Sequence, residues 1–294
     1  MTLAFGAKKI GQFQLASQRV DEPRKAISMY RLTGTYEDLA WVRQGAQQMQ
    51  AEQDNPKGTS MVPVLAGVNR DRHQRLVDKT FRIALRLLEH VQAGTIAQCP
   101  ELLVAVDDQK QQLVGMLLGH IERRLGNGQK TFSFSKHRGH GVLQNRSGLD
   151  WVFSIAPYKG VGSALVSSMF LNNPTSNDSK PFDVLDVLSI TPKATPQAIA
   201  LYRKMGFKPL PALQDQSEIP HVASDLELVN KPDEKRLRLE TANEQEQTAM
   251  SVDYPTFQRR AKSVWKKHQF VPIDDPKDYD LTQIVSFPKY AIKR

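Results

Sequence analysis

The chain of 294 residues has one cysteine, Cys99, and no apolar run that approaches the ~20 residues needed to cross a bilayer. A single cysteine cannot form an internal disulfide, so a reducing compartment is expected. The N-terminus does not resemble a secretory signal, because Lys8 and Lys9 follow a short apolar stretch instead of preceding a longer one. These absences predict a cytoplasmic protein with no membrane span, and delivery into another cell is not excluded.

Acidic residues are fewer than basic ones, 31 against 40, which gives a net charge of +9. Much of the excess lies between His120 and Arg146 and between Arg259 and Lys267. Each cluster is either a solvated surface or a site that attracts an acidic partner, such as cofactor phosphates, an acidic protein or nucleic acid. Neither contains a recognisable nucleic-acid-binding module, so nucleic acid is the less favoured partner. Histidines in the first cluster lack further ligands at regular spacing, so no metal site is expected.

The most informative stretch runs from Trp151 to Phe207, where two apolar strands each lead into a helix. The first strand, 151–157, is followed by Gly160 and Gly162, after which apolar residues recur at helical spacing. Such a junction leaves the first amides of the helix unpaired, and glycines let an anion approach the backbone. The junction therefore predicts a phosphate-binding turn.

The second half of this stretch repeats strand and helix with different residues. Phe182 to Ile190 is predicted to be a strand, Thr195 an N-cap and Pro196 the first helical residue. Gly206 ends the helix, where a left-handed backbone is commonly required. Tyr202 places a phenol on the inward apolar stripe of the helix, where its hydroxyl needs a polar partner.

The two halves resemble the acetyl-CoA signature of the GNAT family of N-acetyltransferases. Gly160–Gly162 fits its glycine half, and the pattern Ala-x-x-Leu-Tyr-x-x-x-Gly-Phe is met from Ala198 to Phe207. The sequence departs from the family at two positions, since Pro157 stands in place of a Gln or Arg and Thr195 in place of an Asn. The resemblance covers Met29 to Asn230, and its central stretch is the specific part.

The resemblance implies an α/β fold with a mixed, mostly antiparallel sheet flanked by helices and extended at both ends. We expect an N-terminal arm over residues 1–27, which show no clean periodicity, and a GNAT-like domain over 28–230. A basic, glycine-containing insertion at 122–148 is expected between the third and fourth strands, on the substrate side. Residues 231–294 are expected to form a linker followed by a helical extension.

Regular patterns elsewhere predict the remaining elements. Strands are expected at Met29–Thr33, Leu102–Val106, Leu113–Ile121, Gly206–Leu210 and His221–Val229. Helices are expected from an N-cap at Thr35 to the break at Asn55, and from Arg70 to Ala93. A further amphipathic helix has basic residues around an apolar stripe of Phe257, Ala261, Val264 and Trp265. That helix either docks on its own domain or binds a partner.

The resemblance implies acetyl-CoA as the cofactor. Its pantetheine arm is expected to pair with the backbone of the strand, and its diphosphate with the amides of the turn. The amide of Ile155 is the expected donor to the thioester oxyanion. The implied cofactor-binding residues are Phe153, Ser154, Ile155, Lys159, Gly160, Val161, Gly162, Ser163, Ala164, Thr195 and Ala198.

Four residues are candidates for proton transfer. Tyr202 matches the family phenol near the leaving sulfur, and a phenol of pKa about 10 is protonated at neutral pH; the alternative is that its ring only fills the core. The base that accepts the proton of the amine is expected to be Asp150 at the start of the fourth strand. Asp186, on an apolar strand face, and Glu122, at the entrance to the insertion, are the other candidates.

The sequence therefore predicts transfer of an acetyl group from acetyl-CoA to an amine, with a protein lysine or N-terminus favoured over a small amine. One alternative is a small-molecule acetyltransferase. Another is a non-catalytic acyl-CoA-binding or interaction module, which the departures at Pro157 and Thr195 permit. An RNA-acetylating enzyme or a partner of a nuclease-like toxin is favoured only by the basic clusters, and a delivered effector would also fit the extensions.

Overall fold

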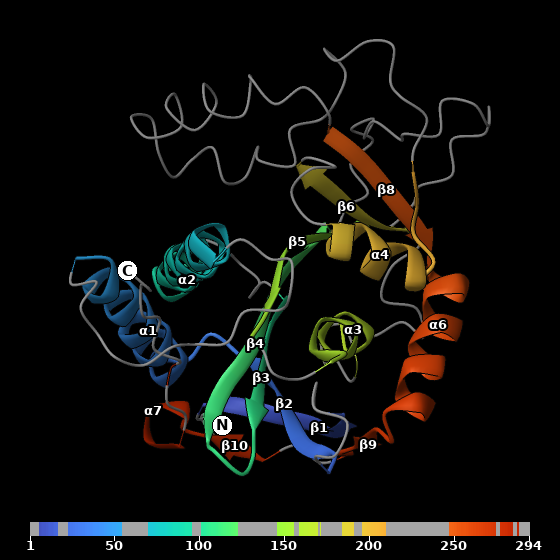
Figure 1. Cartoon of the computed structure of the whole chain (residues 1–294). Helices are drawn as coiled ribbons and strands as arrows, with labels where there is room; N and C mark the ends of the chain where they lie inside the picture. The colour runs from blue at the N-terminus through green and yellow to red at the C-terminus, as the bar shows by residue number, and fades with distance from the viewer. Residues whose placement is uncertain are drawn as a thin grey trace.

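The computed structural model describes residues 6–16, 23–54, 70–95, 101–122, 146–155, 159–169, 171, 184–190, 196–209, 247–274, 277–284 and 287. One sheet runs through this part of the chain, with helices on both faces (Figure 1). Its strand order is β10-β1-β2-β3-β4-β5-β6-β8-β7, and β9 also pairs with β1. Neighbouring strands within the described residues are antiparallel except β5 and β6. The expected mixed, mostly antiparallel sheet flanked by helices is confirmed.

The strands are β1 Ala7–Leu15, β2 Lys25–Leu32, β3 Glu101–Asp107, β4 Gln112–Glu122, β5 Arg146–Ser154, β6 Val184–Ile190, β7 Lys208–Pro209, β8 Gln247–Asp253, β9 Val271–Pro272 and β10 Asp278–Tyr279. The helices are α1 Tyr36–Asp54, α2 Arg70–Gln92, α3 Val161–Ser167, α4 Pro196–Lys204, α6 Tyr254–Lys267 and α7 Leu281–Ile284. None of the described helices is both long enough and apolar enough to cross a membrane.

Alternation along the strands divides the interior into two cores. On β3, Leu102, Val104 and Val106 face the helices α1 and α2, whereas Leu103 and Ala105 face α3 and α6. Successive strand residues point to opposite faces, so a strand covered on both sides is apolar throughout. All of β3 is buried, and the sheet is therefore the middle layer of three (Figure 1).

The predicted helix boundaries on the α1 and α2 side agree with the structure. The hydroxyl of Thr35 accepts from the amide of Asp38 (3.3 Å), and the carboxylate of Asp38 accepts in return from the amide of Thr35 (3.2 Å). This reciprocal cap satisfies amides that the first turn of α1 leaves unpaired. Gly94 follows the end of α2 with φ +70°, the left-handed conformation that glycine adopts without strain.

Residues 7–15 are not part of an arm, as the sequence analysis expects, but a strand that pairs with β2. Ile10, Phe13 and Leu15 are fully buried in the core on the α3 side. The register of β1 shifts between Lys9 and Gly11, and such a bulge breaks the simple alternation by which a strand is recognised in sequence. Strand β2 likewise begins at Lys25, before the predicted Met29.

The C-terminal residues also belong to the central fold. Gln247–Asp253 lies within the predicted linker or its border, yet it forms β8 and pairs with β6 along its whole length. Helix α6 then packs Phe257, Ala261 and Val264 into the core beside α3, so the reading of this helix as docked on its own domain is confirmed. Residues 231–246 and the predicted strand at His221–Val229 lie outside the described residues.

The insertion is narrower than 122–148, because both of its expected ends are strand residues. Glu122 on β4 pairs with Arg146 on β5, and Gly148 lies within β5. The intervening residues 123–145 are outside the described part of the chain. Strand β5 therefore begins at Arg146, five residues before the Trp151 that opens its apolar run.

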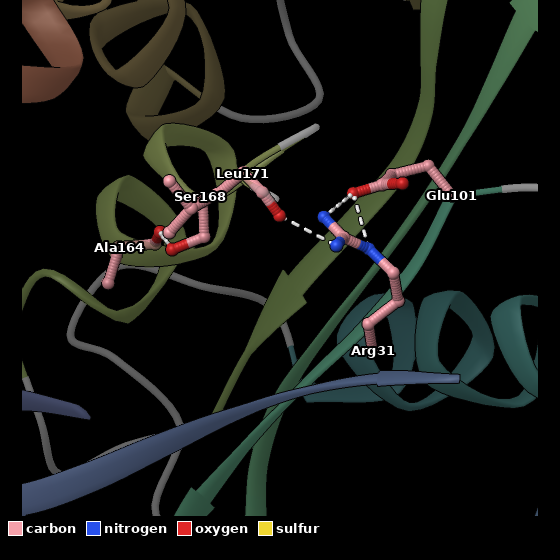
Figure 2. A network of polar contacts seen from close by, with 5 residues as sticks. All are labelled: Arg31, Glu101, Ala164, Ser168 and Leu171. Carbon is pink, nitrogen blue, oxygen red and sulfur yellow. Dashed lines mark hydrogen bonds and ion pairs between the residues drawn. The ribbon is translucent and has the colours of Figure 1, made fainter. Parts of the chain in front are cut away.

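A buried ion pair ties α3 to the sheet. Arg31 on β2 donates from Nη2 to Oε1 of Glu101 on β3 (2.8 Å) and from Nη1 to the carbonyl of Leu171, just beyond α3 (2.6 Å). Figure 2 shows this network, with the hydroxyl of Ser168 donating to the carbonyl of Ala164 in the adjoining turn (2.8 Å). The ion pair joins β2 to β3, and the bond to Leu171 connects the segment after α3 to the same arginine.

Candidate active site

Strands β5 and β6 pair over only part of their length. Their parallel register runs from Arg146 opposite Val184 to Leu149 opposite Val187, where pairing among the described residues ends. Beyond that point β5 continues beside β4, and β6 continues beside β8. The two central strands therefore part after Leu149 and Val187.

Asp150 lies at the point of divergence, in a β-bulge. Trp151 is opposite Leu118 and Leu149 is opposite Gly119, so Asp150 has no residue directly across from it on β4. A bulge of this kind bends its strand and re-aims a side chain. Asp150 is half-buried and directly follows Leu149, the last described residue of β5 that pairs with β6.

The backbone of β5 corrects the predicted oxyanion donor. The amide of Ile155 donates to the carbonyl of Val114 on β4 (2.7 Å), so it faces away from the opening. Antiparallel pairs alternate in the direction of their polar groups, and those of Val152 and Ser154 therefore point away from β4. These two residues, and not Ile155, present amides to the edge that β6 leaves uncovered.

Helix α2 lies beside this edge and contributes a histidine. His73 is buried, and its Nε2 lies 2.9 Å from the carbonyl oxygen of Ser154. Because a carbonyl oxygen only accepts hydrogen bonds, Nε2 carries a proton. Burial lowers the pKa of the ring and thereby favours its neutral form. Six residues further along α2, Nζ of Lys79 lies 4.6 Å from the ring centre of Trp151. The sequence analysis missed His73, although it lies in the helix predicted from Arg70 to Ala93.

The predicted phosphate-binding turn is held in place by its own backbone. Gly160 has φ +99° and precedes α3, and its carbonyl accepts from the amide of Ala164 (2.8 Å). The amide of exposed Lys159 donates to the carbonyl of Ala16 after β1 (3.1 Å). Two of the predicted amides are thus engaged. Those of Val161, Gly162 and Ser163 open the helix, where amides have no partner within the helix itself.

Basic side chains from other elements gather around this turn. Nζ of Lys204, at the end of α4, donates to the hydroxyl of buried Ser163 (3.0 Å). The ring of His268 lies against Gly160, so that a methyl group there would be 3.1 Å from its Nε2. Burial and the charge of Lys267 lower the pKa of Lys204. The sequence analysis missed Lys204 and His268, which are remote from the turn in sequence and carry no local motif.

Tyr202 lies in the core on the α3 side. It is 8% exposed, its ring centre is 5.7 Å from that of Phe207, and burial raises its pKa to about 12. The phenol is therefore protonated throughout the physiological range. Ala198, on the same helix, is half-buried and packs against the same core.

For Asp186 and Glu122, two further predicted bases, the structure gives the position in a strand, and Thr195 is not among the described residues. Asp186 on β6 is opposite Gly148 on β5, close to the end of the parallel pairing. Glu122 is at the far end of β4, opposite Arg146.

Comparisons with known proteins assign no family. No family model matches the chain, and no curated protein matches it. A solved structure described as a bacterial toxin is similar with a TM-score of 0.36 and 14% sequence identity, over 71% of this chain and 98% of that chain. A likeness of this size does not identify a family.

Proposed function

We propose that this protein is a GNAT-type N-acetyltransferase that transfers the acetyl group of acetyl-CoA to an amine, with a protein lysine or N-terminus as the preferred acceptor. The observation that carries the proposal is the parting of β5 and β6 after Leu149 and Val187, with Asp150 in a bulge at that point. The glycine turn and the Tyr202 motif flank the strands that part.

The edge of β5 that β6 leaves unpaired beyond Leu149 suits an extended chain that contains amides. The pantetheine arm of acetyl-CoA is such a chain, and it can pair with a strand through alternate backbone groups. Val152 and Ser154 point the required groups away from β4. The carbonyl of Ser154 receives the hydrogen bond of His73, so a bound arm would either use the other groups of this edge or displace that imidazole.

The proposed reaction begins when the amine loses a proton to Asp150, directly or through water, and its nitrogen attacks the thioester carbonyl. A carbon–nitrogen bond forms, and the carbonyl oxygen becomes an oxyanion that the amide of Val152 or Ser154 stabilises. The carbon–sulfur bond then breaks. Tyr202 is the proposed donor of a hydrogen bond, and then of a proton, to the leaving thiolate. Its pKa of about 12 keeps it protonated at neutral pH and makes it a weaker acid than a free phenol.

Isothermal titration calorimetry with acetyl-CoA and with acetate tests whether the cofactor binds. Mass spectrometry of a cell lysate incubated with the protein and isotopically labelled acetyl-CoA then identifies the acceptor. We expect binding of acetyl-CoA only, and label on lysine or N-terminal amines that is lost with Asp150→Asn. Tight binding without labelled product in any fraction would contradict catalysis, and absence of binding would contradict the proposal as a whole.

A further inference from the structure

We propose that the outer face of α6 binds an acidic segment of a partner protein, and that Arg259 and Arg260 hold its carboxylates in a hollow on this face. The hollow has a volume of about 530 Å³, and its lining residues are Thr256, Arg259, Arg260 and Ser263. None of these residues is assigned a part in cofactor binding or in the proposed reaction. The inference therefore goes beyond the proposed function and does not depend on acetyl transfer.

Helical spacing brings the four lining residues together. They follow Thr256 at intervals of three, four and seven residues, which places them along one side of the helix. Phe257, Ala261 and Val264 lie on a different side and pack into the core beside α3. Figure 1 shows α6 at the margin of the described fold, outside α3 and α4. The lining side chains therefore project from a helix that the core already holds in place.

The turn after α4 lies against the same side chains. A β-carbon at Gly206 would be 2.8 Å from Cγ2 of Thr256 and 3.5 Å from Cγ of Arg260. Arg203 and Lys208, close to Gly206 in sequence, are both exposed. The elements α4, β7 and α6 contain no acidic residue. The hollow is therefore bordered by elements whose charged side chains are all basic.

The basic side chains of α6 are exposed, and none forms an ion pair with another described residue: Arg259, Arg260, Lys262, Lys266 and Lys267. Asp253 directly precedes the helix, and its Oδ1 accepts from the amide of Thr256 (2.8 Å) as the N-cap. Its charge also acts on Arg259. One capping carboxylate leaves this face with an excess of positive charge, which attracts acidic partners.

The groups that line the hollow can all donate hydrogen bonds to a carboxylate. A guanidinium is a planar fork that donates two parallel bonds to the two oxygens of a carboxylate. Nη2 of Arg259 donates to the hydroxyl oxygen of Thr256 (3.3 Å), so the proton of that hydroxyl can still point to a ligand. The hydroxyl of Ser263 is a further donor. Two guanidinium groups and two hydroxyl groups therefore suit neighbouring Asp or Glu side chains.

The aromatic residues of α6 favour an acidic peptide over a nucleic acid. Single-stranded nucleic acids bind where cations alternate with aromatic rings on which the bases stack. The aromatic residues of this helix, Tyr254, Phe257 and Trp265, all pack against the core on the α3 side. Exposed cations without an exposed ring beside them match a chain whose recognition depends on carboxylates.

A fluorescently labelled hexaglutamate peptide is the probe, and fluorescence anisotropy with the full-length protein measures its affinity. In an extended conformation this peptide spans ~20 Å, which is about the length of the 14-residue helix α6. The parent protein should bind it in ~50 mM salt, and the double variant Arg259→Gln/Arg260→Gln should bind it about tenfold more weakly.

The matched control removes two exposed arginines from the other side of the sheet. Arg75→Gln/Arg86→Gln on α2 changes the net charge by the same amount and should bind the peptide like the parent. Far-ultraviolet circular dichroism should be unchanged in both double variants. A parent protein that does not bind hexaglutamate, or equal losses in the two double variants, would overturn the inference.

A third double variant tests the fork geometry. Arg259→Lys/Arg260→Lys keeps both charges but cannot donate two parallel bonds from one planar group, so it should bind the peptide about threefold more weakly than the parent. Affinity equal to that of the parent would show that charge alone acts, and would refute the assignment of the hollow.

Two further titrations decide the class of ligand and separate this inference from the proposed function. Single-stranded RNA that binds more tightly than hexaglutamate, and that is lost with Arg259→Gln/Arg260→Gln, would replace the acidic protein by a nucleic acid and overturn the inference. Acetyl-CoA should bind this variant and the parent alike. Loss of peptide binding with unchanged acetyl-CoA binding therefore supports the inference, and a parent that binds the peptide but not acetyl-CoA contradicts the proposed function alone.

Discussion

Tyr202 is a buried phenol whose pKa is raised to about 12, and the proposed mechanism uses it as an acid. Replacing it with Phe keeps the ring and removes the proton, so Tyr202→Phe should lower kcat about a hundredfold, a typical contribution of a general acid, and change KM for acetyl-CoA little. Steady-state kinetics measures both. Tyr36→Phe, at a residue 74% exposed, should leave both constants unchanged.

The raised pKa also predicts that Tyr202 does not cause a fall in rate at moderately alkaline pH. A group with a pKa of about 12 stays protonated as the pH rises through neutrality and well beyond it. Any alkaline fall in rate below that range therefore belongs to another group. If kcat of Tyr202→Phe equals that of the parent, the ring is only part of the core.

The Arg31–Glu101 pair should matter to stability far more than an exposed pair does. The side chains of Arg31 and Glu101 are 9% and 2% exposed, whereas those of Lys8 and Asp278 are 34% and 32% exposed. Removing one partner leaves an uncompensated buried charge, so Glu101→Gln should lower the free energy of unfolding by about 3 kcal/mol or more. Asp278→Asn should cost at most about 1 kcal/mol.

Urea unfolding monitored by circular dichroism distinguishes these two variants. Similar losses in both would mean that burial of the Arg31–Glu101 pair drawn in Figure 2 does not raise its contribution to stability above that of the exposed pair.

At the scale of single residues, those that belong to a local sequence motif could be predicted, and those that belong to none could not. Gly160 and Tyr202 stand in patterns that depend on their near neighbours in sequence. The direction of the Ile155 amide depends on its register with β4, which sequence periodicity does not specify. His268 reaches the same turn from more than a hundred residues away, so no local pattern contains it.

At the scale of the element, the turn before α3 should be sensitive to a single methyl group. Both Gly160 (φ +99°) and Gly94 (φ +70°) have left-handed backbones, so alanine should cost each about 1–2 kcal/mol of stability. Only at Gly160 would the methyl group meet another residue, His268, because nothing lies within 4 Å of it at Gly94. Gly160→Ala should therefore weaken acetyl-CoA binding about tenfold, and Gly94→Ala should not.

Calorimetry with acetyl-CoA, together with urea unfolding of both variants, checks this expectation. Equal acetyl-CoA affinities in the two variants at equal stability would show that the turn does not contact the ligand.

Elements were predictable where one simple period holds over their length. The helix α6 was found because its buried residues keep the 3.6-residue period and its outer face is charged. Strand β1 was missed because its register shift interrupts the two-residue period. Strand β8 was missed because it directly follows a charged segment, and its pairing with β6 joins residues far apart in the chain.

At the scale of the whole molecule, two buried histidines should make stability depend on pH. The pKa values of His73 and His268 are lowered in the folded protein, that of His268 to about 4, whereas an unfolded histidine titrates at about 6.5. Below about pH 6.5 the unfolded state therefore binds more protons, and the free energy of unfolding should fall as the pH decreases towards about 4.

Urea unfolding at several pH values tests this dependence. His268→Gln should flatten it, because one of the two groups no longer titrates. His90→Gln, which changes an exposed histidine bonded to Thr95, should leave it as in the parent. A parent protein whose stability is constant between about pH 7 and about pH 4.5 would contradict the burial of both rings as neutral groups.

The general architecture followed from the sequence, but the opening in the sheet did not. The patterns of strands and helices indicate an α/β protein, and the family resemblance implies the mixed sheet flanked by helices. The β5–β6 pairing ends after Leu149, where β5 continues beside β4 and β6 continues beside β8. The sequence analysis did not predict β8 as a strand, so it could not predict this opening. The resemblance predicts which residues take part in the proposed reaction, and the register determines which of them lie beside the opening.

The central claim is that the edge of β5 beyond its pairing with β6 receives the extended arm of acetyl-CoA, and amide hydrogen exchange of that edge tests it most directly. On addition of saturating acetyl-CoA, the amides of Val152 and Ser154 should exchange more slowly, while that of Ile155, already bonded to Val114, should change little. Exchange at Val152 and Ser154 that is unchanged while acetyl-CoA is bound would contradict the account.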